Sequence, residues 1–124
     1  MATREIVLSE AVRTPIGTYN GSLKLVSAPD LGTVAIKAVL ARSKLDPAKV
    51  GTVVMGNVIQ AGNKMNPARQ SAVNSGIPVD VPAMTVNRVC GSGAQGIASA
   101  AQEVMLGMLD RMTVSQSEDR DGAH

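Results

Sequence analysis

One stretch of this chain limits its possible folds more than any other. A short β-type run over residues 83–89 changes, through Cys90-Gly91-Ser92-Gly93, into small and apolar residues at helical spacing over 94–108. We therefore predict a strand at about residues 84–89 and a helix that opens at Cys90, the strand–turn–helix pattern of an α/β protein. A helix that is apolar on most faces is usually buried on most faces. A chain of 124 residues has little left to cover it, so we expect a second domain or another subunit to do so.

Cys90 is the only cysteine of the chain and lies where this helix opens. The free N–H groups and the partial positive charge of a helix N-terminus favour a thiolate, which is the nucleophilic form of cysteine. A buried structural thiol is the alternative for such a residue. Position alone leaves both interpretations open.

The rest of the chain predicts alternating strands and helices. Apolar runs indicate a buried strand over residues 6–12 and another over 52–55. Between them, Ser27 and Asp30 match a capping box at the start of a helix, so the order implies a right-handed βαβ unit. Asn66 followed by proline predicts a second helix over residues 68–75. Residues 57–65 fit either an extended loop or an edge strand.

Charge and composition argue against several classes of function. The net charge is +2, the basic residues are scattered, and aromatic residues make up 1% of the chain, so we expect no nucleic-acid partner. One cysteine and one histidine allow neither a disulfide framework nor a metal cluster. No apolar run has the length of a membrane span, and no signal-like segment opens the chain. We expect a soluble, cytoplasmic protein without a membrane partner.

The end of the sequence differs in character from what precedes it. After Asp110 the apolar pattern is lost and charge increases. We predict a polar, disordered tail over residues 111–124, which leaves residues 1–110 as an incomplete α/β domain.

Several motifs, in this order along the chain, resemble the N-terminal part of thiolases, and within that family the acetyl-CoA acetyltransferase branch. The resemblance runs from about Glu5 to about Asp110. The motifs are Arg13-Thr14-Pro15-Ile16-Gly17, Met55-Gly56-Asn57-Val58 with Gln60-Ala61-Gly62, Asn66-Pro67-Ala68-Arg69-Gln70, Gly76-Ile77-Pro78, Val81-Pro82-Ala83 and Asn87-Arg88-Val89-Cys90-Gly91-Ser92-Gly93.

The resemblance implies a function and a site. Cys90 corresponds to the family's nucleophile, which takes an acetyl group from an acyl-CoA as a thioester, before Claisen condensation or thiolytic cleavage with CoA. Its backbone N–H corresponds to one oxyanion donor. The CoA thioester is a substrate, so no cofactor and no metal are implied. The helix after Cys90 corresponds to the central helix of the layered thiolase fold. Residues 58–70 resemble the dimer contact of a homo-oligomer, where Arg69 serves interface structure.

Two functions remain open on this resemblance. Thiolases continue beyond the position of Asp110 with an apolar strand, and later supply a histidine, an asparagine and a second cysteine that have no counterpart here; His124 lacks the flanking residues of that histidine. The first function is a thiolase-type acyltransferase that is complete only with further sequence. The alternative is a non-catalytic, truncated chain that pairs with a full-length thiolase subunit.

Overall fold

A three-stranded parallel sheet forms the middle of the molecule. The computed structural model describes residues 4–110 and 112–116. The strands are β1 (Thr52–Gly56), β2 (Ala83–Val86) and β3 (Met112–Gln116), in the order β2-β1-β3. Both outer strands run parallel to β1, with Val54 opposite Met84 on one side and Val114 on the other. All five residues of β1 are buried, as its continuous apolar sequence predicts for a strand covered on both faces.

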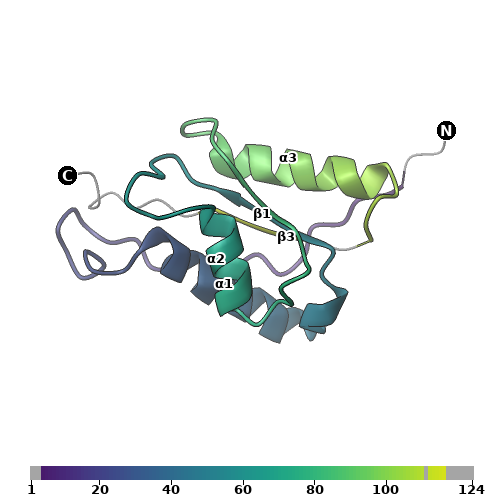
Figure 1. Cartoon of the computed structure of the whole chain (residues 1–124), viewed down its shortest axis with the longest axis horizontal. Helices are drawn as coiled ribbons and strands as arrows, with labels where there is room; N and C mark the ends of the chain where they lie inside the picture. Colours follow the sequence, from purple (N-terminus) through teal and green to yellow (C-terminus); the bar gives the residue numbers. More distant parts are fainter. Residues whose placement is uncertain (1–3, 111, 117–124) are drawn as a thin grey trace.

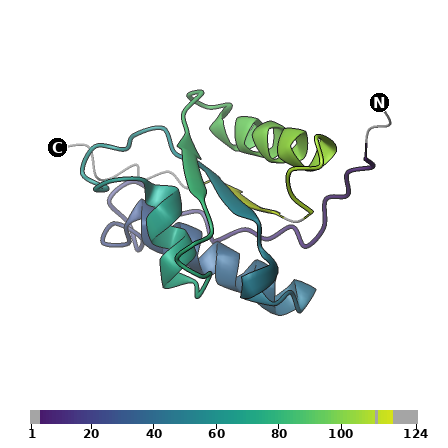
Figure 2. The ribbon, with the colours of Figure 1, turned by 45° about the vertical axis from the view of Figure 1, so that its right-hand side comes forward.

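Helices cover the sheet on both faces (Figures 1 and 2). The helices α1 (Ala28–Ser43) and α2 (Pro67–Asn74) lie together on one face, and α3 (Ser92–Met105) lies on the other. A short 3₁₀ helix, Pro47–Lys49, leads into β1. Along the chain, α2 connects β1 to β2 and α3 connects β2 to β3, so each parallel crossover carries a helix. The predicted α/β class is confirmed.

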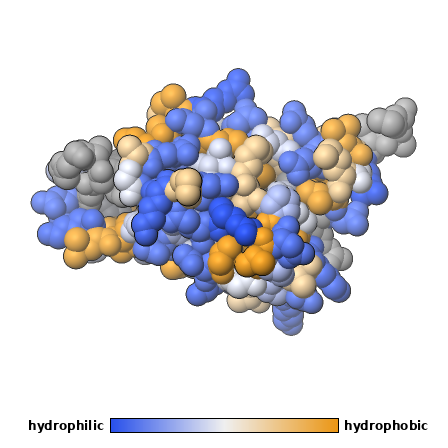
Figure 3. All heavy atoms as spheres, in the orientation of Figure 1, coloured by the Kyte–Doolittle hydropathy of each residue, from blue (hydrophilic) through white to orange (hydrophobic). Residues whose placement is uncertain are grey.

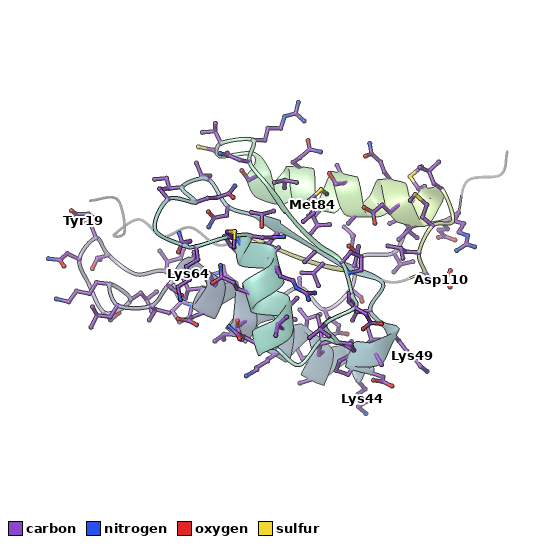
Figure 4. All side chains as sticks on the ribbon, in the orientation of Figure 1. Tyr19, Lys44, Lys49, Lys64, Met84 and Asp110 are labelled. Atoms are coloured by element: carbon purple, nitrogen blue, oxygen red, sulfur yellow. The ribbon has the colours of Figure 1, made fainter. Side chains whose placement is uncertain are left out.

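The apolar core lies between β1 and the two helices on its α1–α2 face. It is aliphatic throughout, because the chain has almost no aromatic residues. Its buried members are Ile36, Leu40, Val50, Val53, Ala72, Ile77 and Val81. Figure 4 shows Lys44 and Lys49 on one side of the molecule and Lys64 and Tyr19 on the other.

Local signals placed the first two helices correctly. Ser27 is the N-cap of α1, and its hydroxyl accepts the Asp30 N–H at 3.2 Å. Asn66 caps α2 in the same way by accepting the Arg69 N–H at 3.2 Å. Gly76, with φ +91°, follows α2 where the sequence predicts its end. The predicted strand at residues 84–89 is shorter than expected and ends at Val86.

The predicted strand over residues 6–12 is wrong. The structure has no strand between residues 4 and 18, and Val7 and Leu8 are exposed. Glu10 has φ +55°, which interrupts the extended backbone that a strand requires. The βαβ unit expected around α1 is therefore absent from the described residues, and the units are β1-α2-β2 and β2-α3-β3. Residues 57–65, left open between loop and strand, form a loop.

The predicted disorder after residue 110 is wrong for residues 112–116, which form β3. Its backbone pairs with β1 from Thr52↔Met112 to Gly56↔Gln116. Backbone ladders need an available strand edge rather than a long apolar sequence, and β1 provides one. Residue 111 and residues 117–124, which include His124, lie outside the described residues.

One face of α3 is not covered by the described chain. Ser92, Gly96 and Ala100 are buried at spacings of four toward the sheet. Ile97 and Met105 of the helix are exposed, as are Leu106 and Met108 just after it. Figure 3 shows apolar surface at both ends of this helix. The structure thus agrees with the expectation that this chain covers only one side of the helix.

Candidate active site

Cys90 lies in the loop between β2 and α3, at the end of the sheet where the parallel strands β1 and β2 finish. Sites of open parallel sheets occur outside the carboxyl ends of the strands. The thiol is free, and Cys90 is exposed in the described part of the chain. The helix begins at Ser92, so Cys90 directly precedes the N-cap residue Gly91 instead of opening the helix itself.

The residue before Cys90 has an unfavourable backbone conformation. Val89 has φ +48°, a left-handed value that costs an L-residue roughly 1–2 kcal/mol, and β-branched residues rarely adopt it. The turn closes with two backbone hydrogen bonds, from Gly91 N–H to Arg88 O at 3.0 Å and from Ser92 N–H to Val89 O at 3.0 Å. Cys90 is therefore presented on a tight, strained turn.

Ser92 lies beneath this turn and is completely buried. Its hydroxyl accepts the Arg88 N–H at 2.9 Å and donates to Val89 O at 2.6 Å. Hydroxyls near helix starts commonly bond to nearby backbone in this way. Ser92, the first residue of α3, therefore bonds to the backbone on both sides of the Val89 turn.

Asn87 holds the other side of the turn. Its Oδ1 accepts the Val89 N–H at 3.0 Å, and its Nδ2 donates to Val58 O at 3.0 Å. The first bond is the local asparagine-to-backbone bond two residues on that is typical of turns. The second joins the Cys90 turn to the loop that follows β1.

Gly56, the last residue of β1, touches the start of α3. A Cβ at this position would lie 2.6 Å from the carbonyl carbon of Ser92 and 2.8 Å from the Gly93 nitrogen. Backbone atoms cannot rotate out of the way, so only glycine allows this approach. The end of the central strand thus supports the helix start directly behind Cys90.

The start of α3 carries positive charge. Gly91 offers no side chain to cap the first-turn N–H groups, which give this end of the helix its partial positive charge. The Arg88 guanidinium lies beside the same turn and donates to Gln95 Oε1 at 2.6 Å. Negative charge that develops on a carbonyl next to Cys90 would be stabilised here.

Arg69, on α2, makes its hydrogen bonds to another part of the chain. Arg69 donates to Val79 O at 2.6 Å and to Val81 O at 3.0 Å, and so ties α2 to the segment that leads into β2. These bonds lie within one chain, and the expected role of Arg69 in a dimer interface stays a prediction. Arg13 and Lys64 are exposed. The sequence did not assign roles to Asn87, Ser92 and Gly56 individually, although the local spacing of Asn87 and Ser92 about Val89 is a usable signal.

Comparison with known proteins identifies the family. The family model described as Thiolase, N-terminal domain, matches residues 6–118. This chain belongs to the thiolase family. It is 43% identical over 119 residues to the acetyl-CoA acetyltransferase of Cupriavidus necator, which covers 96% of this chain and 30% of that protein. It is 46% identical over 116 residues to the acetyl-CoA acetyltransferase of Escherichia coli, which covers 94% and 29%.

A solved thiolase shares the fold. The crystal structure of human mitochondrial 3-ketoacyl-CoA thiolase in complex with CoA superimposes with a TM-score of 0.75 at 43% identity, over 78% of this chain and 25% of that chain. This thiolase-family chain thus spans about 30% of the length of the curated relatives that it matches. The match to residue 118 corrects the expectation that the resemblance stops near Asp110, because β3 continues the alternation of strand and helix. Within the described residues, no helix has both the length and the apolar character to cross a membrane.

Proposed function

We propose that this chain supplies the nucleophile-bearing part of a thiolase-type acyltransferase and that Cys90 accepts the acyl group. The single observation that carries the proposal is a free, exposed cysteine held on a strained turn before α3 in a chain of the thiolase family. The names of the relatives, acetyl-CoA acetyltransferase, favour acetyl as the acyl group.

In the proposed first step, Cys90 Sγ attacks the thioester carbonyl of acetyl-CoA. The bond from Sγ to the acetyl carbon forms, the bond from that carbon to the CoA sulfur breaks, and the thiol proton ends on the released CoA. The Cys90 N–H is the proposed donor to the carbonyl oxygen. In the second step the bond from Sγ to the acetyl carbon breaks, and the acetyl group passes to the α-carbon of another acetyl-CoA or to the sulfur of CoA. The proton lost from that α-carbon or from the CoA thiol ends on Cys90 Sγ, which restores the thiol.

The substrate, the compartment and the oligomeric state are proposed on the same basis. Acyl-CoA is the substrate, and no separate cofactor is needed for either step. A free, exposed thiol fits a reducing compartment such as the cytoplasm. We propose that the intact protein is a homo-oligomer, which light scattering on purified protein would test.

The first step can be tested on the chain as it is. Purified protein is incubated with acetyl-CoA, and intact mass spectrometry records the acetylated fraction over time. We expect one acetyl group per chain, lost again when free CoA is added, because thioester exchange is reversible.

Two controls make a negative result informative. The Cys90→Ala variant should take up no acetyl group, because the chain has no other cysteine. Iodoacetamide should alkylate Cys90 in the unmodified chain. Normal alkylation without acetylation would contradict an acyl transfer performed by this chain.

The exposed face of α3 favours a second candidate function. Ile97 and Met105 of this helix, with Leu106 and Met108 just after it, are exposed apolar residues. They would be covered if this chain paired with a full-length thiolase subunit and had no catalytic role of its own. Co-elution with a full-length thiolase in size-exclusion chromatography is the expected result. Two separate peaks at micromolar concentrations would speak against pairing.

A further inference from the structure

We propose that Asn87 and Ser92 are positioning residues for Cys90: together they clamp Val89 in its left-handed conformation and so determine where the thiol lies. The inference rests on the proposed function, in which Cys90 is the acyl acceptor. It assigns to these two side chains a role in reactivity in addition to their role in folding.

The conformation of Val89 needs support from its neighbours. Six non-glycine residues in the described part of the chain have positive φ: Glu10, Asn20, Lys44, Lys64, Asn66 and Val89. Val89 is the β-branched one among them, so its conformation is the least favourable of the set. Such conformations persist only where surrounding contacts impose them, and they concentrate at functional sites.

Side-chain hydrogen bonds hold Val89 from both sides. The Val89 N–H donates to Asn87 Oδ1 at 3.0 Å. Its carbonyl oxygen accepts both the Ser92 hydroxyl at 2.6 Å and the Ser92 N–H at 3.0 Å. The Ser92 hydroxyl also accepts the Arg88 N–H at 2.9 Å. Every backbone polar group of Val89 is therefore engaged within this clamp.

The clamp is anchored to the sheet. Asn87 Nδ2 donates to Val58 O, just beyond β1, and the Ser92 backbone rests against Gly56 at the end of β1. Cys90 is the next residue after Val89, so a return of Val89 to negative φ would reorient the Cys90 backbone. The thiol would then leave its place before the uncapped start of α3.

The experiment measures the second-order rate of Cys90 alkylation by iodoacetamide at neutral pH, by intact mass spectrometry. We compare the unmodified chain with Ser92→Ala, Asn87→Ala and Asn87→Ser. Alkylation requires the sulfur to be open to the reagent, at the place before α3 where the clamp holds it. Removing either half of the clamp should therefore slow alkylation about two- to fivefold.

Two further variants separate positioning from simple stabilisation. A serine at position 87 keeps an oxygen acceptor for the Val89 N–H, so Asn87→Ser should recover most of the rate that Asn87→Ala loses. Ser71→Ala is the matched control, because Ser71 is equally buried and its hydroxyl donates to Pro29 O at 2.8 Å on the α1–α2 side of the sheet. It should alkylate at the unmodified rate.

A spectroscopic readout reports the clamp directly. A residue with positive φ gives a strong NOE between its own amide proton and Hα, and Val89 should show one in the unmodified chain and in Ser71→Ala. We expect it to weaken in Ser92→Ala and Asn87→Ala. Should Ser92→Ala fail to fold, the Asn87 variants decide alone, because Asn87 is exposed.

Unchanged alkylation and an unchanged NOE in the clamp variants would overturn the proposal, as would equal slowing in Ser71→Ala. Alkylation requires no CoA, so the outcome is independent of acyl transfer. If the clamp variants alkylate more slowly but the unmodified chain never takes up an acetyl group, the clamp is supported and the proposed function is contradicted. If the unmodified chain is acetylated but the clamp variants alkylate at its rate, only the clamp proposal is contradicted.

Discussion

Replacing Gly56 with alanine tests how closely the end of β1 approaches the start of α3. The new Cβ would lie 2.6 Å from the Ser92 carbonyl carbon and 2.8 Å from both the Ser92 oxygen and the Gly93 nitrogen. Ordinary carbon contacts begin near 3.4 Å, so strand and helix must separate by roughly 0.8 Å in an interior that is close-packed.

The magnitude follows from two opposing effects. Overpacking of this kind costs about 1–3 kcal/mol, and here the obstructing atoms are all backbone, which cannot change rotamer. Alanine also restricts the unfolded chain, which offsets about 0.4–1 kcal/mol. We therefore expect Gly56→Ala to lower the free energy of unfolding by about 1–2 kcal/mol.

Urea denaturation followed by far-ultraviolet circular dichroism is the suitable assay, because the chain has one tyrosine and no tryptophan. Gly17→Ala is the matched control. Gly17 is exposed and its nearest neighbour is the flexible Leu23 side chain at 3.1 Å, so its stability should stay within about 0.5 kcal/mol of the unmodified chain. Equal unfolding midpoints for the two variants would refute the close approach of β1 to α3.

Three further substitutions test other parts of the fold by the same urea measurement. Ser27→Ala removes the N-cap of α1 and should cost about 1 kcal/mol; an unchanged midpoint would mean that the cap contributes nothing. Arg69→Ala removes the bonds to Val79 O and Val81 O and should cost about 1–3 kcal/mol, with incomplete recovery in Arg69→Lys because lysine lacks the planar fork. Ile36→Ala leaves a cavity in the α1–β1 core, where Ile36 is 1% exposed, and should cost about 2–5 kcal/mol; a smaller loss would indicate that the core collapses around it.

The predictions from sequence that succeeded rest on interactions within a few residues. Ser27 with Asp30, and Asn66 with Pro67, mark the starts of α1 and α2 because an N-cap bonds to an amide three residues on. The unbroken apolar run of residues 52–55 predicted a strand buried on both faces, which β1 is. The motif around Cys90 indicated the family that the comparison confirmed, since the family is encoded in local residue order.

The failures concern strand pairing, which joins residues far apart in the chain. The apolar run over residues 6–12 has suitable composition but no strand structure, whereas the more polar residues 112–116 pair with β1 along their whole length. Strand formation depends on an available edge and on context more than on intrinsic preference. A pattern of apolar residues cannot say which segment reaches that edge.

Around Cys90, too, local features could be predicted from the sequence and contacts between distant segments could not. The linear order of residues predicts that this cysteine lies between a strand and a helix, and it indicates the family. The bond from Asn87 to Val58 O and the contact with Gly56 could not be predicted, because each depends on the end of β1 and the β2–α3 turn meeting in space. Short spacings in the sequence predict local hydrogen bonds. Close approaches between distant backbone segments arise only when the sheet and its helices pack together.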